Sequence, residues 1–278
     1  MRRIPSVRSG VAPIVGLALS LALASGASAQ VLISGVLSGH GNVPVSGAAV
    51  TLLQVGMNGA PARALGAATS GSDGRFSIAY TCPVGNPETY VTAIGGDAGG
   101  GVNHAIGLMA ILGQCKAIGS QPQLVNELTT VAGEWAWAQF TDSTGASVSI
   151  TTNTRGLITA ANLARTNLVN TSAGVPASFL SSVASTCSGS SPAANCDSLE
   201  KLNTLADILL ACTSDTTHNF ARCESLAANT LGKNRMLMVA HYMATNPEIN
   251  RAALFSLSTL AKSLFKPELP MVPSNPGL

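Results

Sequence analysis

The spacing of apolar residues changes from a period of two to a period near 3.6 about halfway along the chain. Residues 75–80 alternate between apolar and polar side chains, as expected for a half-buried β-strand. Leu202, Leu205 and Leu209 instead recur at helical spacing. Because the two patterns occupy separate halves, the sequence predicts an α+β fold: an N-terminal antiparallel β-sandwich followed by a small helical domain stapled by disulfides.

Four segments of the first half have the composition of short strands and are separated by turns rich in Gly, Asn, Asp and Pro. They are residues 31–37, 49–55, 75–80 and 89–94. The segment 95–101 holds five glycines and is expected to be a flexible loop.

Four helices are expected in the second half, three of them from the helical spacing of apolar residues. They cover residues 157–168, 202–212, 235–245 and 253–264, and residues 128–140 are a further candidate. Asn246, Pro247 and Glu248 are expected to begin the last of these as its N-cap, first-turn proline and acidic first turn. The Ser-, Ala- and Gly-rich residues 171–194 are expected to form a loop.

The chain therefore divides into four expected parts. They are a signal peptide (1–29), a β-sandwich (30–116), a helical domain (117–265) and a proline-rich tail (266–278) that serves as a linker or a docking strand.

The first part has the pattern of a cleavable signal peptide. Arg2, Arg3 and Arg8 precede an uncharged apolar run, 11–24, and a small-x-small site at 27–29. The alternative is a membrane anchor, but about fourteen residues fall short of the roughly twenty that span a bilayer. We expect an exported protein, located in the periplasm, at the cell surface or outside the cell, with no transmembrane segment after cleavage.

Charge argues against nucleic acid as a partner. Removal of residues 1–29 takes away three of the fifteen Lys and Arg and leaves twelve against thirteen Asp and Glu. The formal charge of the mature chain is then near −1, which gives no basic surface for nucleic acid or an anionic membrane.

Six cysteines in an exported chain indicate disulfides. They are Cys82, Cys115, Cys187, Cys196, Cys212 and Cys223. Six cysteines allow fifteen pairings, of which the sequence-local one (82–115, 187–196 and 212–223) is the simplest. Metal binding is the competing interpretation, and it is disfavoured because no C-x2-C pair or nearby histidine pair occurs.

Three motifs in the first half carry a resemblance to a known family. They are Gly35, residues 44–52 (PVSGAAVTL) and residues 72–78 (SDGRFSI). Together they resemble the carboxypeptidase-regulatory-like, Cna B-type β-sandwich, also called transthyretin-like. The resemblance implies an accessory sandwich and does not imply the zinc enzyme itself.

The remaining motifs resemble a narrower group, the N-terminal region of bacterial secreted proteins that carry NHL-type β-propeller repeats. They are residues 81–83 (TCP), 95–99 (GGDAG), 105–110 (AIGLMA), 112–115 (LGQC), 126–132 (NELTTVA), 202–209 (LNTLADIL) and 247–255. The resemblance supports pairing Cys82 with Cys115 and Cys212 with Cys223, and it makes Cys187–Cys196 an addition of this protein. In that group a propeller commonly follows the helical region, whereas this sequence runs to Leu278 without one, so no propeller ligand is implied.

Some Cna B-type domains form a Lys–Asn isopeptide bond inside the sandwich. The first lysine of this chain is Lys116, so composition excludes a bond formed entirely within residues 30–115. A Cys82–Cys115 disulfide would serve as the cross-link instead.

No motif marks a catalytic, cofactor-binding or metal-ligating residue, and no cofactor is expected. The chain has no H-E-x-x-H zinc motif and no G-x-S-x-G nucleophile elbow, and the glycine-rich loop lacks a Walker lysine. The four histidines, His40, His104, His218 and His241, are scattered.

Trp135 and Trp137 are the only tryptophans. Because residues i and i+2 of a helix point to different faces, we expect one to be buried and the other partly exposed. Packing in the core or at the domain seam is one interpretation, and a ligand platform is the other.

The sequence predicts a non-enzymatic exported module for envelope or extracellular binding. Its partner is unknown, with an envelope protein or an extracellular glycan as candidates. One alternative is an accessory, glycan-binding component of an extracellular enzyme system. Another is an enzyme whose unrecognised site includes Asp73, Asp97 and His104.

Overall fold

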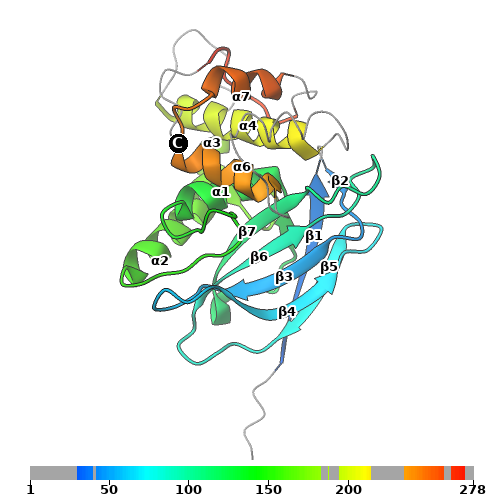
Figure 1. Cartoon of the computed structure of the whole chain (residues 1–278), viewed down its shortest axis with the longest axis vertical. Helices are drawn as coiled ribbons and strands as arrows, with labels where there is room; N and C mark the ends of the chain where they lie inside the picture. Colours follow the sequence, from blue (N-terminus) through cyan, green and yellow to red (C-terminus); the bar gives the residue numbers. More distant parts are fainter. Residues whose placement is uncertain are drawn as a thin grey trace, which may run out of the picture.

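The computed structural model describes residues 30–39, 42–182, 187, 194–213, 235–259 and 264–272. The expected signal peptide, His40, His218 and Cys223 lie outside these residues. Within them the fold is mixed α+β: two β-sheets form one part of the molecule, and helices cover one side of the sheets (Figure 1).

The first sheet is organised around β1 (Val31–Gly39). This strand pairs antiparallel with β2 (Val43–Pro44) and β5 (Arg75–Tyr80). It also pairs with β8 (Gln123–Val125), and this pairing is parallel. The otherwise antiparallel sheet therefore takes one strand from beyond the expected boundary at residue 116.

The second sheet is antiparallel throughout, with strand order β4-β3-β6-β7. Its strands are β3 (Ala49–Gln54), β4 (Arg63–Thr69), β6 (Glu88–Ile94) and β7 (Gly107–Gln114). The sequence predicted β1, β3, β5 and β6 but missed β4, which is rich in Ala and Gly, and β7.

The two sheets share one hydrophobic core. Ile33 and Ile78 of the first sheet belong to the same buried cluster as Val50 and Val91 of the second. That cluster continues into the helical part through side chains such as Leu209, so the core does not end at the expected boundary near residue 116.

Strand β7 lies between this core and the helices. Leu108, Ala110 and Leu112 face the shared core, whereas Met109 and Ile111 pack in a second cluster with Trp137. Both faces of the strand are therefore buried, and for this reason its sequence is a continuous apolar run without the alternation of a half-buried strand.

Helix α1 (Glu127–Trp137) is anchored to β7 at its first turn. The Asn126 side chain accepts a hydrogen bond from Thr129 N at 3.0 Å, and the Thr129 hydroxyl accepts one from Asn126 N at 2.9 Å, which forms a capping box. The hydroxyl of Thr130 accepts a hydrogen bond from Met109 N at 2.9 Å. These bonds hold the start of the helix on the sheet.

The other elements complete the helical part. They are the 3-10 turn η1 (Cys115–Ala117), α2 (Thr154–Leu163), the π-helical turn η2 (Ala164–Leu168), the hairpin β9 (Val169–Asn170) and β10 (Val175–Pro176), α3 (Ser178–Ser181), α4 (Ala194–Thr213), α6 (Arg235–Thr245) and α7 (Arg251–Ser258). Helix α7 packs against α4 at the end of the molecule away from the sheets, whereas α6 contacts α1, α4 and strand β7 (Figure 1). None of the described helices is long and apolar enough to cross a membrane.

Two expectations for the helical part were wrong. Residues 171–194 were expected to be a loop, but they contain β10 and α3 because the apolar Leu180 packs into the core. Asn246 does not cap the last helix: residues 247–250 form turns, Asn250 occupies the N-cap, and α7 begins at Arg251. That helix ends at Ser258, so Leu264 lies outside it.

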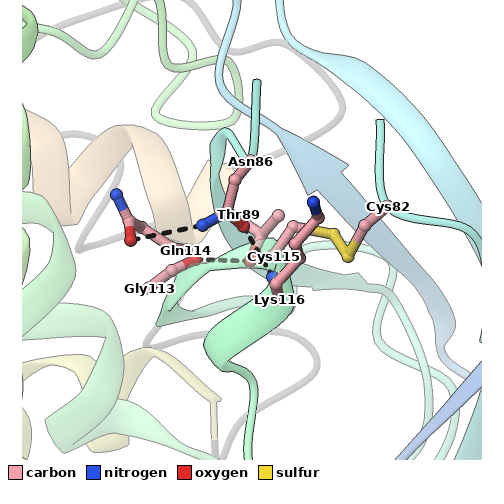
Figure 2. Close-up of a disulfide and its surroundings, with 7 residues drawn as sticks. All are labelled: Cys82, Asn86, Thr89, Gly113, Gln114, Cys115 and Lys116. Carbon is pink, nitrogen blue, oxygen red and sulfur yellow. Dashed lines mark hydrogen bonds between the residues drawn. A yellow bond between two sulfur atoms is a disulfide. The ribbon is translucent and has the colours of Figure 1, made fainter. Parts of the chain in front are cut away.

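Two of the expected disulfides lie within the described residues, Cys82–Cys115 and Cys187–Cys196. Cys212 is also disulfide-bonded. Figure 2 shows the bridge from Cys115, just after β7, to Cys82, just after β5. Beside it, Asn86 accepts a hydrogen bond from Lys116 N at 2.7 Å and donates one to Gln114 Oε1 at 3.3 Å (Figure 2).

Candidate binding pocket

An apolar pocket opens among α1, α4, α6, α7 and the segment 264–272. The space among these elements, including space open to solvent, is about 470 Å³. The lining side chains are Trp135, Lys201, Thr204, Leu205, Ile208, Met243, Asn246, Pro247, Arg251, Leu254, Phe255 and Leu269. Because they come from four helices and one extended segment, only the folded chain brings them together.

The two tryptophans have the different environments that their spacing predicted. Trp137 is fully buried, donates a hydrogen bond to Leu157 O at 3.1 Å and packs edge-on against Tyr90, with 5.7 Å between ring centroids. Trp135 is half-buried and lines the pocket. Core packing is therefore the role of Trp137, whereas Trp135 packs against the edge of the core and lines the pocket.

One wall of the pocket is the segment 264–269, which polar side chains hold against α4. Asp207 accepts hydrogen bonds from Leu264 N at 3.0 Å and Phe265 N at 3.2 Å. Two neighbours of Asp207 on α4 add further bonds. Thr204 accepts a hydrogen bond from Leu269 N at 2.9 Å, and Asn203 donates one to Pro267 O at 2.8 Å. These bonds place Leu269 at the pocket.

Burial raises the pKa of Asp207 to about 6, and the two backbone amides oppose that shift. Within the described residues, its Oδ2 atom has no hydrogen-bond partner. The segment is therefore held by a carboxyl group that is taken out of water at a cost in free energy.

The charged residues that line the pocket are both cations, Lys201 and Arg251. Lys201 Nζ lies 2.8 Å from Asp197 Oδ2, and Arg251 Nη1 lies 2.9 Å from Glu248 Oε2. Neither of the two carboxylates lines the pocket. Each of the two cations that line the pocket is therefore paired with a carboxylate outside it.

A buried carboxyl group lies next to Trp135 in sequence. Glu134 is fully buried, and its Oε2 atom lies 3.3 Å from Nδ1 of His241 on α6. Burial raises the pKa of Glu134 to about 7, and His241 opposes the shift. Neither residue lines the pocket, so the pair joins two helices behind it.

A second hollow, with an empty volume of about 900 Å³, lies beside the Cys82–Cys115 disulfide. Val31, Tyr80, Val84 and Lys116 are among its lining residues. Both cysteines are oxidised in the bridge, so this hollow has no thiol nucleophile.

Asp73 and Asp97, which the sequence suggested for an unrecognised enzyme site, accept hydrogen bonds within their own loops. Asp97 accepts hydrogen bonds from Gly99 N at 2.7 Å and Gly101 N at 2.9 Å, which gives the glycine-rich loop a defined shape. Asp73 accepts one from Arg75 N at 3.1 Å, and His104 is exposed. Within the described ranges, no group of three or more His, Cys, Asp or Glu residues could hold a metal ion.

Sequence reasoning missed Asp207 and Glu134. A signal for Asp207 was present, because Asn203 and Asp207 are four residues apart and therefore share one face of the helix. No comparable signal distinguishes Glu134, since an acidic residue in a helix is usually exposed.

Comparison with known proteins adds little to this geometry. No family model matches the chain, and no curated protein matches it. Among solved structures, the chain is weakly similar to a 9R-lipoxygenase from Cyanothece PCC8801, with 17% identity and a TM-score of 0.21. That similarity covers 30% of this chain and 13% of the lipoxygenase chain, and it carries no argument about fold or activity.

Proposed function

We propose that this chain is a non-enzymatic exported binding protein of the cell envelope or extracellular space, and that the pocket at Trp135 is its binding site. The pocket is the observation that carries the proposal. Most of its lining side chains are apolar, and none is a cysteine, a histidine or an acid. Such a surface suits the binding of an apolar group.

The β part supports the proposal as a scaffold. We propose that the two sheets form the carboxypeptidase-regulatory-like sandwich that the motifs at Gly35, 44–52 and 72–78 resemble. The disulfides are compatible with export, since such bonds persist in oxidising compartments. The cleavage pattern at 27–29 points the same way.

The glycan-binding alternative has no comparable support. Sugar recognition by stacking needs exposed aromatic rings, and the large exposed apolar residues on the described strands are aliphatic: Val31, Leu32 and Val175. Trp135 lies instead in a recess bordered by aliphatic side chains such as Leu205 and Leu254.

Binding of Nile red, an uncharged apolar dye, to residues 30–278 tests the proposal. We expect saturable binding with enhanced dye fluorescence. Leu205→Trp fills the pocket and should abolish it, whereas Leu163→Trp, at a side chain 52% exposed at the end of α2, should leave it unchanged. Circular dichroism establishes that both variants fold.

Equal dye binding by the wild type and the Leu205→Trp variant would overturn the proposal. If the Leu205→Trp variant does not fold, the Phe255→Trp variant takes its place in the comparison, because Phe255 lines the same pocket from α7.

A further inference from the structure

We propose that the open edge of β1 at residues 31–34 binds an extended peptide segment of another protein, which adds to the sheet as one more strand. An apolar side chain of that segment enters the hollow beside the Cys82–Cys115 disulfide, and an acidic side chain pairs with Lys116. The site shares no lining residue with the pocket at Trp135, so it is a second binding surface beyond the proposed function. Strand β1 begins at the end of the molecule away from α7 (Figure 1).

The first half of β1 is paired on one side only. Residues 31–36 pair with β5 along one edge, whereas the opposite edge is covered by β8 at 35–37 and by β2 at 38–39. Among the described residues, no strand pairs with that opposite edge at 31–34. Backbone N–H and C=O groups point outward along an unpaired edge, and an extended peptide pairs with them as a neighbouring strand does.

The sequence of β1 leaves this edge unprotected. Exposed edge strands usually carry charged residues, proline or a bulge, which prevent pairing with other chains. Residues 31–39 contain no charged residue and no proline. Val31 and Leu32 are instead apolar, and they are 43% and 66% exposed. The edge therefore suits an added strand, which also takes these two side chains out of water.

The hollow beside the disulfide adjoins the start of this edge. Val31 is among its lining residues, and so is Tyr80, which is opposite Val31 on β5. The space that water-sized molecules can occupy there is about 460 Å³, far more than one water molecule needs, so a side chain of the added strand fits. Val84 and Ile118 also line the hollow, and their surface favours an apolar side chain.

Lys116 gives the hollow its charge preference. The residue is exposed, and its ammonium group forms no ion pair or hydrogen bond within the part of the chain that the structure describes. None of the described residues that line the hollow is acidic. A second copy of this chain, joined through the same surface about a two-fold axis, brings another Lys116 and no acid from the hollow. Charge therefore favours a segment of a different protein that carries a carboxylate.

Fluorescence anisotropy with residues 30–278 and a synthetic peptide tests the strand addition. The probe is a labelled, capped peptide of alternating valine and threonine with one central glutamate. Its counterpart carries methyl groups on the central backbone nitrogens, so it keeps the side chains and loses the hydrogen-bond donors. We expect the methylated peptide to bind about tenfold more weakly, which is the effect of one or two lost hydrogen bonds. Equal binding of the two peptides, or binding of neither, would overturn the proposal.

Hydrogen exchange locates the added strand. On saturation with the peptide, amides of residues 31–34 that face the open edge should exchange several-fold more slowly, whereas amides near Trp135 should not change. Protection near Trp135 without protection of residues 31–34 would overturn this inference and leave the proposed function standing.

Lys116→Gln assigns the acidic contact. This variant should bind the glutamate peptide about two- to fivefold more weakly and should bind a peptide with glutamine in place of glutamate as the wild type does. Arg155→Gln is the matched control, because Arg155 is an exposed cation on α2 that does not line the hollow. Equal weakening by the two variants would show that the contact with Lys116 is wrong.

Sedimentation equilibrium of residues 30–278 tests the other occupant of the edge. We expect a monomer in the absence of peptide. A dimer that the peptide dissociates would show that a second copy of the chain covers residues 31–34, and it would overturn the assignment to a different protein.

Discussion

Glu134 Oε2 lies 3.3 Å from Nδ1 of His241, and this contact joins α1 to α6 inside the protein. Within the described residues, the other oxygen of this carboxyl group, Oε1, is buried without a hydrogen-bond partner. A buried carboxylate with one unsatisfied oxygen is costly to ionise, so the pair makes the stability of the fold depend on pH.

The first prediction concerns that pH dependence. Burial raises the pKa of Glu134 from 4.5 to about 7 in the folded protein, with Asp142 adding to the shift and His241 opposing it. At a pH between these two pKa values, Glu134 is protonated more often in the folded state than in the unfolded state. Stability from this group is therefore present below about pH 4.5 and is lost as pH rises to about 7, by at most about 3 kcal/mol.

Urea unfolding between pH 4.5 and 8 measures this effect, with Glu134→Gln as the variant. Gln does not titrate, so the free energy of unfolding of the variant should fall less over this pH range than that of the wild type. Part of the dependence should remain, because burial also raises the pKa of Glu88 to about 7 and of Asp207 to about 6. Parallel curves for the two proteins would contradict the assignment.

The second prediction concerns the segment 264–269. Asp207→Ala removes the acceptor of two backbone hydrogen bonds, so the amides of Leu264 and Phe265 should exchange with solvent faster. Stability should fall by about 1–3 kcal/mol. Asp207→Asn keeps an acceptor oxygen and should stay close to the wild type in hydrogen exchange, which separates loss of the bonds from loss of the charge.

The third prediction ranks two disulfides. Cys82–Cys115 spans 33 residues and Cys187–Cys196 spans 9, so the first removes more entropy from the unfolded chain. Replacing both cysteines by alanine should cost about 3–4 kcal/mol for the first bridge and about 2–3 kcal/mol for the second. Chemical unfolding without reductant compares the two; a larger loss for the Cys187–Cys196 pair would contradict the ranking.

The fourth prediction concerns Gly35 in the middle of β1. A Cβ atom at this position would overlap the ring of Phe76 and the backbone carbonyl oxygen of Gln123, because β5 and β8 both pack against the strand here. Gly35→Ala should therefore destabilise the protein by about 2 kcal/mol or more.

Gly119→Ala is the matched control. The nearest atom to a Cβ there, Gln121 N, is 3.9 Å away, so the change should be neutral. Thermal unfolding of the two variants checks the contrast, and equal midpoints would show that β8 can move away from Gly35 at little cost.

Local pattern was enough for several elements. Residues 75–80 form β5 because their alternation matches a strand with one buried face, and residues 235–245 form α6 as predicted. The pairing of Cys82 with Cys115 also followed the simplest sequence-local choice. Local pattern failed for β7, because a strand buried on both faces has no alternation to detect, and for the start of α7, where Asn250 rather than Asn246 takes the N-cap position.

The sequence alone determined the strand at 75–80, the helix at 235–245, the absence of a recognisable catalytic motif and the different environments of Trp135 and Trp137. These properties depend on neighbours within a few residues, which the sequence displays directly. Only the tertiary structure decided that β8 joins β1, that Asp207 holds Leu264, and that the pocket forms between Trp135 and Phe255. Each of these joins residues far apart in the chain, and such contacts are set by the packing of the whole core.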